Sequence, residues 1–307
     1  MKKSCFILSA MLTTGIAFSQ QEYSYTFFGD NNSFFNPAAT GVKDYATLTG
    51  QFRKQWFKFS GSPTSGGVTY EAPLKKYNMG LGGILYQDHV GVTDQTNAAA
   101  MYSYHIRLNE EHTLSFGINA GIDVVNTKYD RLVYWDMYDE VFGSDYINFV
   151  VPHFGIGAFY SFHEFYAGVS IPRMVSINAN QFNSVNFTNA PSLVSHYYAT
   201  TGYKFRLDND FSLKTALLLK YTNNVKPQLD ISLLGYYKNT IGLGVAYKSL
   251  GFASAFLQYN YKDAVVFAYG FDLSLNPLYQ HSKGSHEIML QYRFGFKSRI
   301  PKDAPSI

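Results

Sequence analysis

Ser285, His286 and Glu287 follow one another near the C-terminus, and they offer a nucleophile, a base and an acid side by side. Hydrolases use such groups for acyl transfer, and the serine hydroxyl must then donate a hydrogen bond to the imidazole. On a strand, however, neighbouring side chains point to opposite faces. Ser285 and His286 then cannot share that bond, and the sequence supplies no oxyanion site. We therefore predict no catalytic residues and no enzyme.

Charged residues on separate strands form a second candidate group, a polar network in the interior. Asp272 and Glu287 lie opposite each other if their hairpin pairs residue 275 with residue 284. Like charges repel at such a position. The simpler interpretation is a solvated network, and the alternative is an internal latch that holds a plug or a client segment. The inward cations expected to answer the carboxylates are Arg293 and Lys214.

Arg53, Gln55 and Trp56 stand where an early strand is predicted to end and a long loop begins. Trp and Arg are enriched at the centres of protein interfaces, so these residues could recognise a partner. The alternative is an aromatic residue at the membrane surface beside an interior cation, which is common in barrels.

Histidine spacing and net charge argue against metal and nucleic-acid partners. The eight histidines never share a strand face with a carboxylate at ligand spacing, so we predict no metal site and no cofactor. Two of the 25 basic residues lie within the first 19 positions, which leaves 23 against 22 acidic residues. A chain so close to neutral, without a basic run, is not predicted to bind nucleic acid.

The N-terminus has the pattern of a cleaved export signal. A basic start, Met1-Lys2-Lys3, precedes an apolar run and then the small residues Ala17 and Ser19 before Gln20. We expect residues 1–19 to be a signal peptide. The only cysteine, Cys5, leaves with it, so no disulfide is expected to stabilise the mature chain.

From about residue 45 to 297 the chain alternates between apolar and small or polar residues, the period of β-strands. Within 264–275, for example, Phe267 and Phe271 share one face, while Asp272 lies on the other. Aromatic residues make up 18% and charged residues 15%, against roughly 25% charged residues in soluble domains. After the signal, no apolar run is long enough for a membrane helix. We therefore predict an all-β transmembrane antiparallel β-barrel with an apolar outer face.

About fourteen strands are expected, an even number, as single-chain bacterial barrels prefer. Six alternate connections are tight turns, and the remaining ones include every long loop. Because short turns face the periplasm and long loops the exterior, we expect an integral outer-membrane protein with both termini in the periplasm. The C-terminal tail is expected over 298–307. The long loops are expected at 54–63, 128–150, 172–193 and 276–284.

Residues 20–44 do not alternate, although they contain Phe27-Phe28, Phe34-Phe35 and the turn-prone Asn36-Pro37. Apolar side chains outside a strand must be buried elsewhere. This segment is therefore predicted to plug the lumen or to form a periplasmic docking arm. A partly filled lumen is also indicated by the inward-facing residues Phe159, Leu218, Leu234 and Phe256.

Motifs at both ends of the chain form a recognisable set. Asn36-Pro37-Ala38-Ala39-Thr40-Gly41 precedes Arg53-Lys54-Gln55-Trp56 and Gly61-Ser62-Pro63. The final strand begins Gly284-Ser285-His286-Glu287-Ile288. The set resembles the PorP/SprF family of the type IX secretion system of Bacteroidetes, with its N-P-A-x-x-G, R-x-Q-W…G-x-P and G-S-H-E-I-x-L-x-Y-x-F segments. The resemblance spans the whole mature chain.

The resemblance implies a non-enzymatic role in moving proteins that carry a sorting C-terminal domain across the outer membrane. Some family members contact the periplasmic ring of the machine, and others serve large surface adhesins, some linked to gliding motility. Expected partners are therefore outer-membrane lipid, such secreted proteins, and core or ring proteins. The alternative function is a passive channel for small solutes. Residues predicted to bind partners are Asn36, Pro37, Arg53, Gln55, Trp56, Gly61 and Pro63.

Overall fold

The computed structural model describes residues 25–128, 146–176, 195–223, 225–276, 280 and 282–295. The predicted signal peptide, the C-terminal tail and most of the two longest predicted loops lie outside these residues. Within the described part of the chain, no helix is long and apolar enough to cross a membrane.

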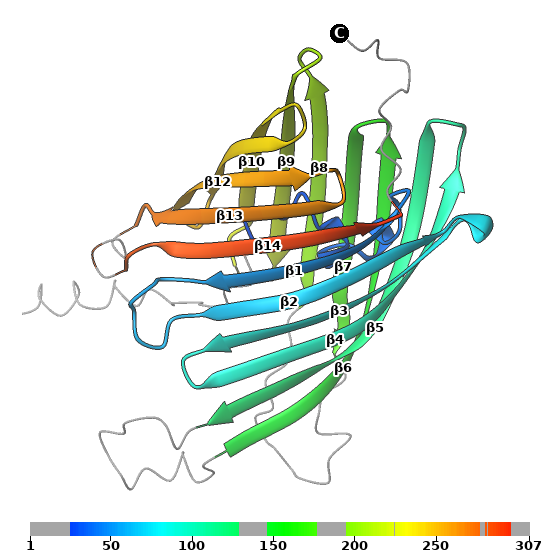
Figure 1. The fold of residues 1–307 in the computed structure, drawn as a ribbon. Helices are drawn as coiled ribbons and strands as arrows, with labels where there is room; N and C mark the ends of the chain where they lie inside the picture. The colour runs from blue at the N-terminus through cyan, green and yellow to red at the C-terminus, as the bar shows by residue number, and fades with distance from the viewer. Residues whose placement is uncertain are drawn as a thin grey trace, which may run out of the picture.

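Fourteen strands pair side by side into one closed antiparallel barrel, in which the first strand also pairs with the last (Figure 1). Closure gives each of these strands a hydrogen-bonded neighbour on both sides, which satisfies backbone N–H and C=O groups that lipid could not. The predicted fold class and strand number are confirmed. The strands are β1 (Ala46–Lys54), β2 (Thr64–Leu74), β3 (Met79–Val90), β4 (Thr93–Arg107), β5 (His112–Lys128), β6 (Tyr146–Phe162), β7 (Phe165–Ser176), β8 (His196–Arg206), β9 (Phe211–Thr222), β10 (Gln228–Tyr237), β11 (Ile241–Lys248), β12 (Phe252–Tyr261), β13 (Val265–Ser274) and β14 (Ser285–Phe294).

Side chains alternate across the barrel wall. On β14, Ile288 and Leu290 point outward and are 42% and 52% exposed, whereas Glu287 and Met289 are buried inside. The other strands repeat this pattern, with large apolar side chains outside and mostly polar or small ones inside. This arrangement suits hydrocarbon outside and a polar interior, as the alternation predicted.

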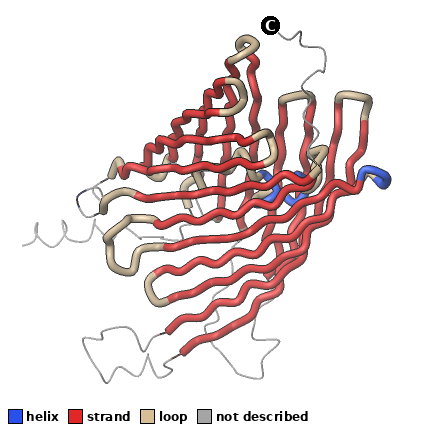
Figure 2. The backbone as a smooth tube through the Cα atoms, viewed as in Figure 1, coloured by secondary structure: helices blue, strands red, loops and turns tan. Residues whose placement is uncertain are grey.

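The two ends of the barrel differ in the length of their connections, as predicted. Tight turns join β2 to β3 and every second pair after it, and some contain residues in the left-handed region, such as Asn78 (φ 52°) and Lys238 (φ 51°). The longer connections lie at the opposite end (Figure 2). We call these the turn end and the loop end. β1 begins and β14 ends at the turn end.

Residues 25–45, before β1, form no strand. They contain two single-turn 3-10 helices, η1 (Asn32–Phe34) and η2 (Pro37–Ala39), drawn in blue in Figure 2. Asn36 caps η2 by accepting a hydrogen bond from Ala38 N, and Pro37 occupies the first helical position. A third such helix, η3 (Lys75–Tyr77), lies in the turn between β2 and β3. We call residues 25–44 the inner segment.

Candidate functional site: the occupied barrel interior

The inner segment is buried against inward-facing side chains of the wall. Tyr25, Phe27 and Phe28 are each 1% exposed, and Ala38 is fully buried. Phe27 packs in a cluster with residues of β10–β14, including Leu234, Phe256 and Met289. Burial of this much aromatic surface holds the segment in place without any strand pairing.

A second cluster joins the segment to the neighbouring part of the wall. Tyr25, Phe28 and Phe35 pack with Tyr198, Ala216 and Leu218 of β8 and β9. Phe159 of β6 packs with Ala38 and Ala39. The four apolar residues predicted to fill the lumen, Phe159, Leu218, Leu234 and Phe256, therefore all pack in clusters that include inner-segment residues.

Four charged side chains form a buried cluster on the loop-end side of the interior: Arg53, Lys248, Asp272 and Glu287. Arg53 donates to both carboxylates, with Nη2 2.5 Å from Asp272 Oδ2 and Nη1 2.9 Å from Glu287 Oε2. Lys248 Nζ lies 2.9 Å from Asp272 Oδ2. Two cations and two carboxylates balance, and such pairing is what makes buried charges tolerable. We call these residues the charge cluster.

The charge cluster binds the inner segment at Thr26. The Thr26 N–H donates to both oxygens of Glu287, at 3.0 and 2.9 Å. The Thr26 hydroxyl donates to Asp272 Oδ1 at 3.2 Å and accepts from Lys248 Nζ at 2.9 Å. Hydrogen bonds with an ionised partner are stronger than neutral ones. The charge cluster therefore has the geometry of a latch on the first described residues of the chain.

The predicted arrangement of Asp272 and Glu287, directly opposite each other and paired with Arg293 and Lys214, is wrong. Asp272 pairs with Ser285, and Glu287 pairs with Gly270, so the carboxylates are offset by two residues instead of directly opposed. Arg53 bridges them and removes the repulsion. The predicted cations pair elsewhere: Lys214 with Asp30 at 2.6 Å, and Arg293 with Gln291 Oε1 at 3.1 Å.

Two further ion pairs hold the rest of the segment. Asp30 accepts from Lys214 and, at 2.7 Å, from Gln258 Nε2. Burial alone would raise the pKa of the Asp30 carboxyl, but Lys214 and the hydrogen bonds hold that pKa below its ordinary value. Lys43 Nζ lies 3.0 Å from Glu71 Oε1. Burial would lower the pKa of Lys43, yet the Glu71 carboxylate raises it. Both pairs favour the ionised forms.

Close packing holds the segment near the turn end. Asn36 Nδ2 donates to the carbonyl of Ala158 at 3.0 Å. A Cβ at Gly157 would stand 2.0 Å from Asn36 Oδ1, and a Cβ at Gly117 would stand 2.3 Å from Ala38 N. The two glycines therefore let η2 lie directly on the backbone of β5 and β6.

The inner segment runs along the interior from the loop-end side to the turn end. Thr26 contacts residues close to the loop ends of β11, β13 and β14. Further along, Ser103, close to the turn end of β4, donates to the Thr40 carbonyl at 2.6 Å. The chain then enters β1 at its turn end.

The residues predicted to bind partners divide between the interior and a loop. Arg53 and Asn36 are 4% and 1% exposed, and Pro37 is also buried. These three side chains cannot meet another protein while the inner segment is in place, which corrects the expectation of a surface patch or periplasmic contact. For the loop residues, partner binding stays a prediction. They lie between β1 and β2, where Gln55 N donates to Pro63 O at 2.9 Å, and they are Gln55, Trp56 and Gly61. Pro63 of the same loop is buried, so the expectation that its side chain meets a partner is corrected too.

Ser285 and His286 point to opposite faces of β14. The Ser285 hydroxyl faces inward and accepts from the Trp56 N–H at 3.1 Å. His286 Nδ1 lies 2.7 Å from the Tyr269 hydroxyl on the outer face. The two side chains therefore cannot work as a nucleophile and its base. In the described part of the chain, no three His, Cys, Asp or Glu residues gather closely enough to hold a metal ion.

Sequence reasoning missed several residues of this site, among them Thr26 and Lys248. Thr26 binds through both its backbone N–H and its hydroxyl, and it lies in a segment without the alternation that would assign it to a face. Lys248, in contrast, shares the inward face of β11 with Ala246. Extending the alternation to the last residue of that strand would have identified it.

Solved structures of outer-membrane barrels resemble this fold. The CymD monoaromatic hydrocarbon channel is 12% identical with a TM-score of 0.50, over 89% of this chain and 94% of that one. Omp33 of Acinetobacter baumannii is 9% identical with a TM-score of 0.48, over 83% of this chain and 100% of that one. The toluene transporter TbuX of Ralstonia pickettii is 10% identical with a TM-score of 0.47, over 85% and 92%. At these identities the likeness shows the fold alone.

Comparison of the sequence with protein-family profiles identifies a family, which the structural likeness does not. No curated protein sequence matches the chain. The profile of a family described as "Type IX secretion system membrane protein PorP/SprF" matches residues 17–292.

Proposed function

Since the chain belongs to the PorP/SprF family of type IX secretion system membrane proteins, we propose that it is a non-enzymatic docking component of that system. The loop end or the lumen of this outer-membrane barrel holds a secreted protein through its sorting C-terminal domain. The turn end faces the periplasm, where it contacts ring or core proteins.

The occupied interior is the observation that supports docking over free diffusion. A channel for small solutes needs an open lumen. Here the inner segment bonds to strands on opposite sides of the barrel, including Glu287 on β14 and Ser170 on β7. Its aromatic residues pack against the wall between those bonds.

In this proposal the inner segment is a removable plug. Its bonds to the wall are hydrogen bonds, ion pairs and apolar contacts, all of them reversible. When the plug leaves, Arg53 remains paired with Asp272 and Glu287, so the charge cluster stays neutral. A client segment with a free backbone N–H or a cation can then take the place of Thr26.

A pull-down of the tagged protein from native outer membranes in gentle detergent tests the docking role. Recovery of a secreted protein with its sorting domain, or of periplasmic ring proteins, supports the proposal. Recovery of the barrel alone, together with steady conductance after reconstitution in a lipid bilayer, would overturn it and leave the channel.

A reversible lock tests whether the plug must move. Asn31 Nδ2 of the inner segment lies 3.2 Å from Thr69 Oγ1 of β2, so a disulfide between Asn31→Cys and Thr69→Cys would fix the two together. We expect the oxidised protein to lose its client and the reduced protein to regain it. Equal recovery in both states would show that the client binds without displacing the segment. The single variant Thr69→Cys is the control for the substitution itself.

A further inference from the structure

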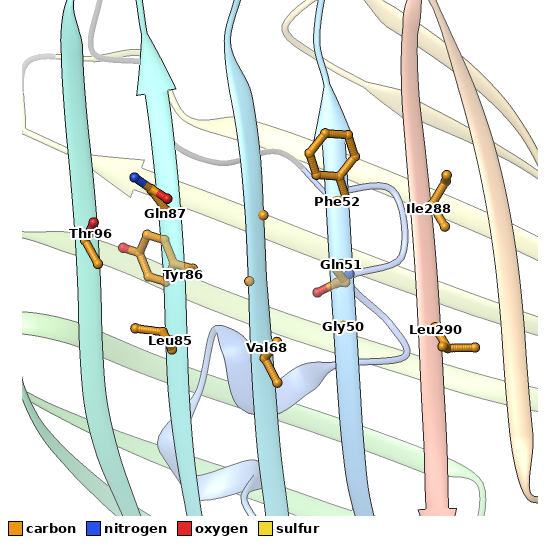
Figure 3. Close-up of a pocket in the computed structure, with 12 residues that line it drawn as sticks. Gly50, Gln51, Phe52, Val68, Leu85, Tyr86, Gln87, Thr96, Ile288 and Leu290 are labelled. Carbon is orange, nitrogen blue, oxygen red and sulfur yellow. The ribbon is translucent and has the colours of Figure 1, made fainter.

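An apolar groove lies on the outer face of the barrel where the first and last strands meet (Figure 3). Its volume is about 510 Å³. Phe52, Val68, Leu85, Ile288 and Leu290 surround it, and each is at least 42% exposed on the lipid-facing side. The groove lies in the loop-end half of the wall, because Phe52 and Ile288 stand two and three residues from the strand ends.

Two glycines form the floor of the groove, Gly50 of β1 and Gly66 of β2. Neither is required by the backbone, since neither has a positive φ. Neither is required by packing: a Cβ at Gly50 would meet only the Leu290 carbonyl, at 3.9 Å, and one at Gly66 would come no closer than 3.4 Å to Phe52 Cδ2. The inward Gly67 differs, because its Cβ would stand 2.5 Å from that of Tyr86. The two outward glycines leave space that a larger side chain could fill without strain.

A basic and aromatic rim lies at the loop end next to the groove. Residues 54–64 and 282–286 contain Lys54, Lys58 and Lys283 but no acidic residue. The Phe57 N–H donates to the Gly284 carbonyl at 2.7 Å, and the Lys283 N–H donates to the Phe57 carbonyl at 3.1 Å. This backbone pair joins the two loops, and both Lys58 and Lys283 are exposed there.

We propose that the groove and this rim together bind one phosphorylated glycolipid of the outer leaflet, of the lipid A class. An acyl chain lies over Gly50 and Gly66, and the phosphate contacts Lys58 and Lys283. Phe57 and Phe59, 43% and 45% exposed, lie at the level of the headgroup. The inference needs the loop end to face the cell exterior, as in the proposed function, but it does not need a secretion role.

The shape and charge of the surface favour a lipid over a protein. A stable protein interface buries roughly 1,200–2,000 Å² and is surrounded by polar residues on both partners. This groove has a volume of only about 510 Å³, and the basic residues beside it lie at its loop end. An occupant with an apolar tail and an anionic head matches both parts. Basic clusters beside a membrane surface bind anionic headgroups in the same way.

Native mass spectrometry of the full-length protein, extracted from its own outer membrane, tests the inference. We expect wild-type protein to retain a phosphorylated glycolipid. The groove variant Gly50→Leu/Gly66→Leu is expected to lose it. The rim variant Lys58→Gln/Lys283→Gln is expected to bind it about 30-fold more weakly, from the typical contribution of two lysines at a membrane surface.

Two matched variants control for folding and charge. Gly235→Leu places the same side chain on the outer face of β10, where a Cβ meets only the Leu243 carbonyl at 3.8 Å. Lys75→Gln/Lys76→Gln removes the same charge from the turn end. Both should retain the glycolipid as wild type does. Equal retention by all variants, retention of a diacyl phospholipid instead, or a protein that co-purifies only while the groove is open would each overturn the inference.

Discussion

The inner segment is held by charge at Thr26, near the loop end, and by shape at η2, nearer the turn end, where the Lys43–Glu71 ion pair follows. At Thr26 it adds hydrogen bonds to a charge cluster whose members remain paired with one another without it. At η2 it lies on glycines whose lack of side chains makes room for it. A charge-held end can open and close with little loss of stability in the barrel wall, because the wall residues stay paired. A shape-held end stays where it is unless the wall itself changes, so in the proposed plug the loop end opens first.

Removing the Arg53 charge at the charge-held end should cause the largest loss in the free energy of unfolding. Arg53→Gln leaves Asp272 and Glu287 buried without their shared cation, which costs about 3–5 kcal/mol. The measurement is the free energy of unfolding in urea, followed by tryptophan fluorescence of the refolded barrel. Arg206→Gln is the control, because its pair with Glu164 is exposed at the turn end and such pairs contribute about 1 kcal/mol or less. Equal losses in the two variants would contradict a buried latch.

A larger side chain at Gly157, in the shape-held end, should cause the next largest loss of stability. A valine at Gly157 would drive Asn36 off the wall, at a cost of about 1–3 kcal/mol for overpacking. We expect the inner segment to come loose while the barrel stays closed. Maleimide labelling of Ser33→Cys reports this, because Ser33 is 2% exposed and no other cysteine is expected in the mature chain. Gly235→Val, on the outer face, should leave labelling slow. Fast labelling in both variants would show that Gly157 is not a specific support.

Asn36→Ala separates hydrogen bonding from close packing at the same end, because it removes side-chain atoms instead of adding them. It removes the hydrogen bond to the Ala158 carbonyl and the cap of η2 without adding bulk. The expected loss of stability is about 1–2 kcal/mol. The labelling rate of Ser33→Cys should rise less than with Gly157→Val. A larger rise would mean that hydrogen bonds, not shape, hold this end.

The smallest expected change in stability comes from the middle of the segment, where the contribution of Asp30 depends on pH. The pKa of Asp30 lies below its ordinary value of 3.8, so its pairing contributes stability above that pH, which is lost as the pH falls through the lowered pKa. Asp30→Asn should therefore destabilise the protein by about 1 kcal/mol at pH 7 and by less at pH 3. Urea midpoints at the two pH values measure this. A constant difference between variant and wild type would show that the carboxylate charge is not what stabilises the segment.

The barrel could be predicted from the sequence because its signals are local. Alternation on β13 and β14 and the tight turns depend on neighbouring residues alone. The register of that hairpin could not be predicted, since a long loop does not fix it. For Arg53 the sequence leaves two environments open, a partner-binding patch or an interior cation, and the interior position is the one confirmed. Its partners, Asp272 and Glu287, lie 219 and 234 residues away, a separation that no local pattern spans.

The separation between Thr26 and Glu287, 261 residues, also orders events during assembly. Thr26 cannot reach its final position until the last strand has been made and has joined β1. Until then Thr26 lacks Asp272 and Glu287, the two carboxylates that it binds, and the aromatic residues of the inner segment need shelter from water and from other chains. Seating of Thr26 is therefore a late step, and a barrel with its inner segment in place is one whose final strand is complete.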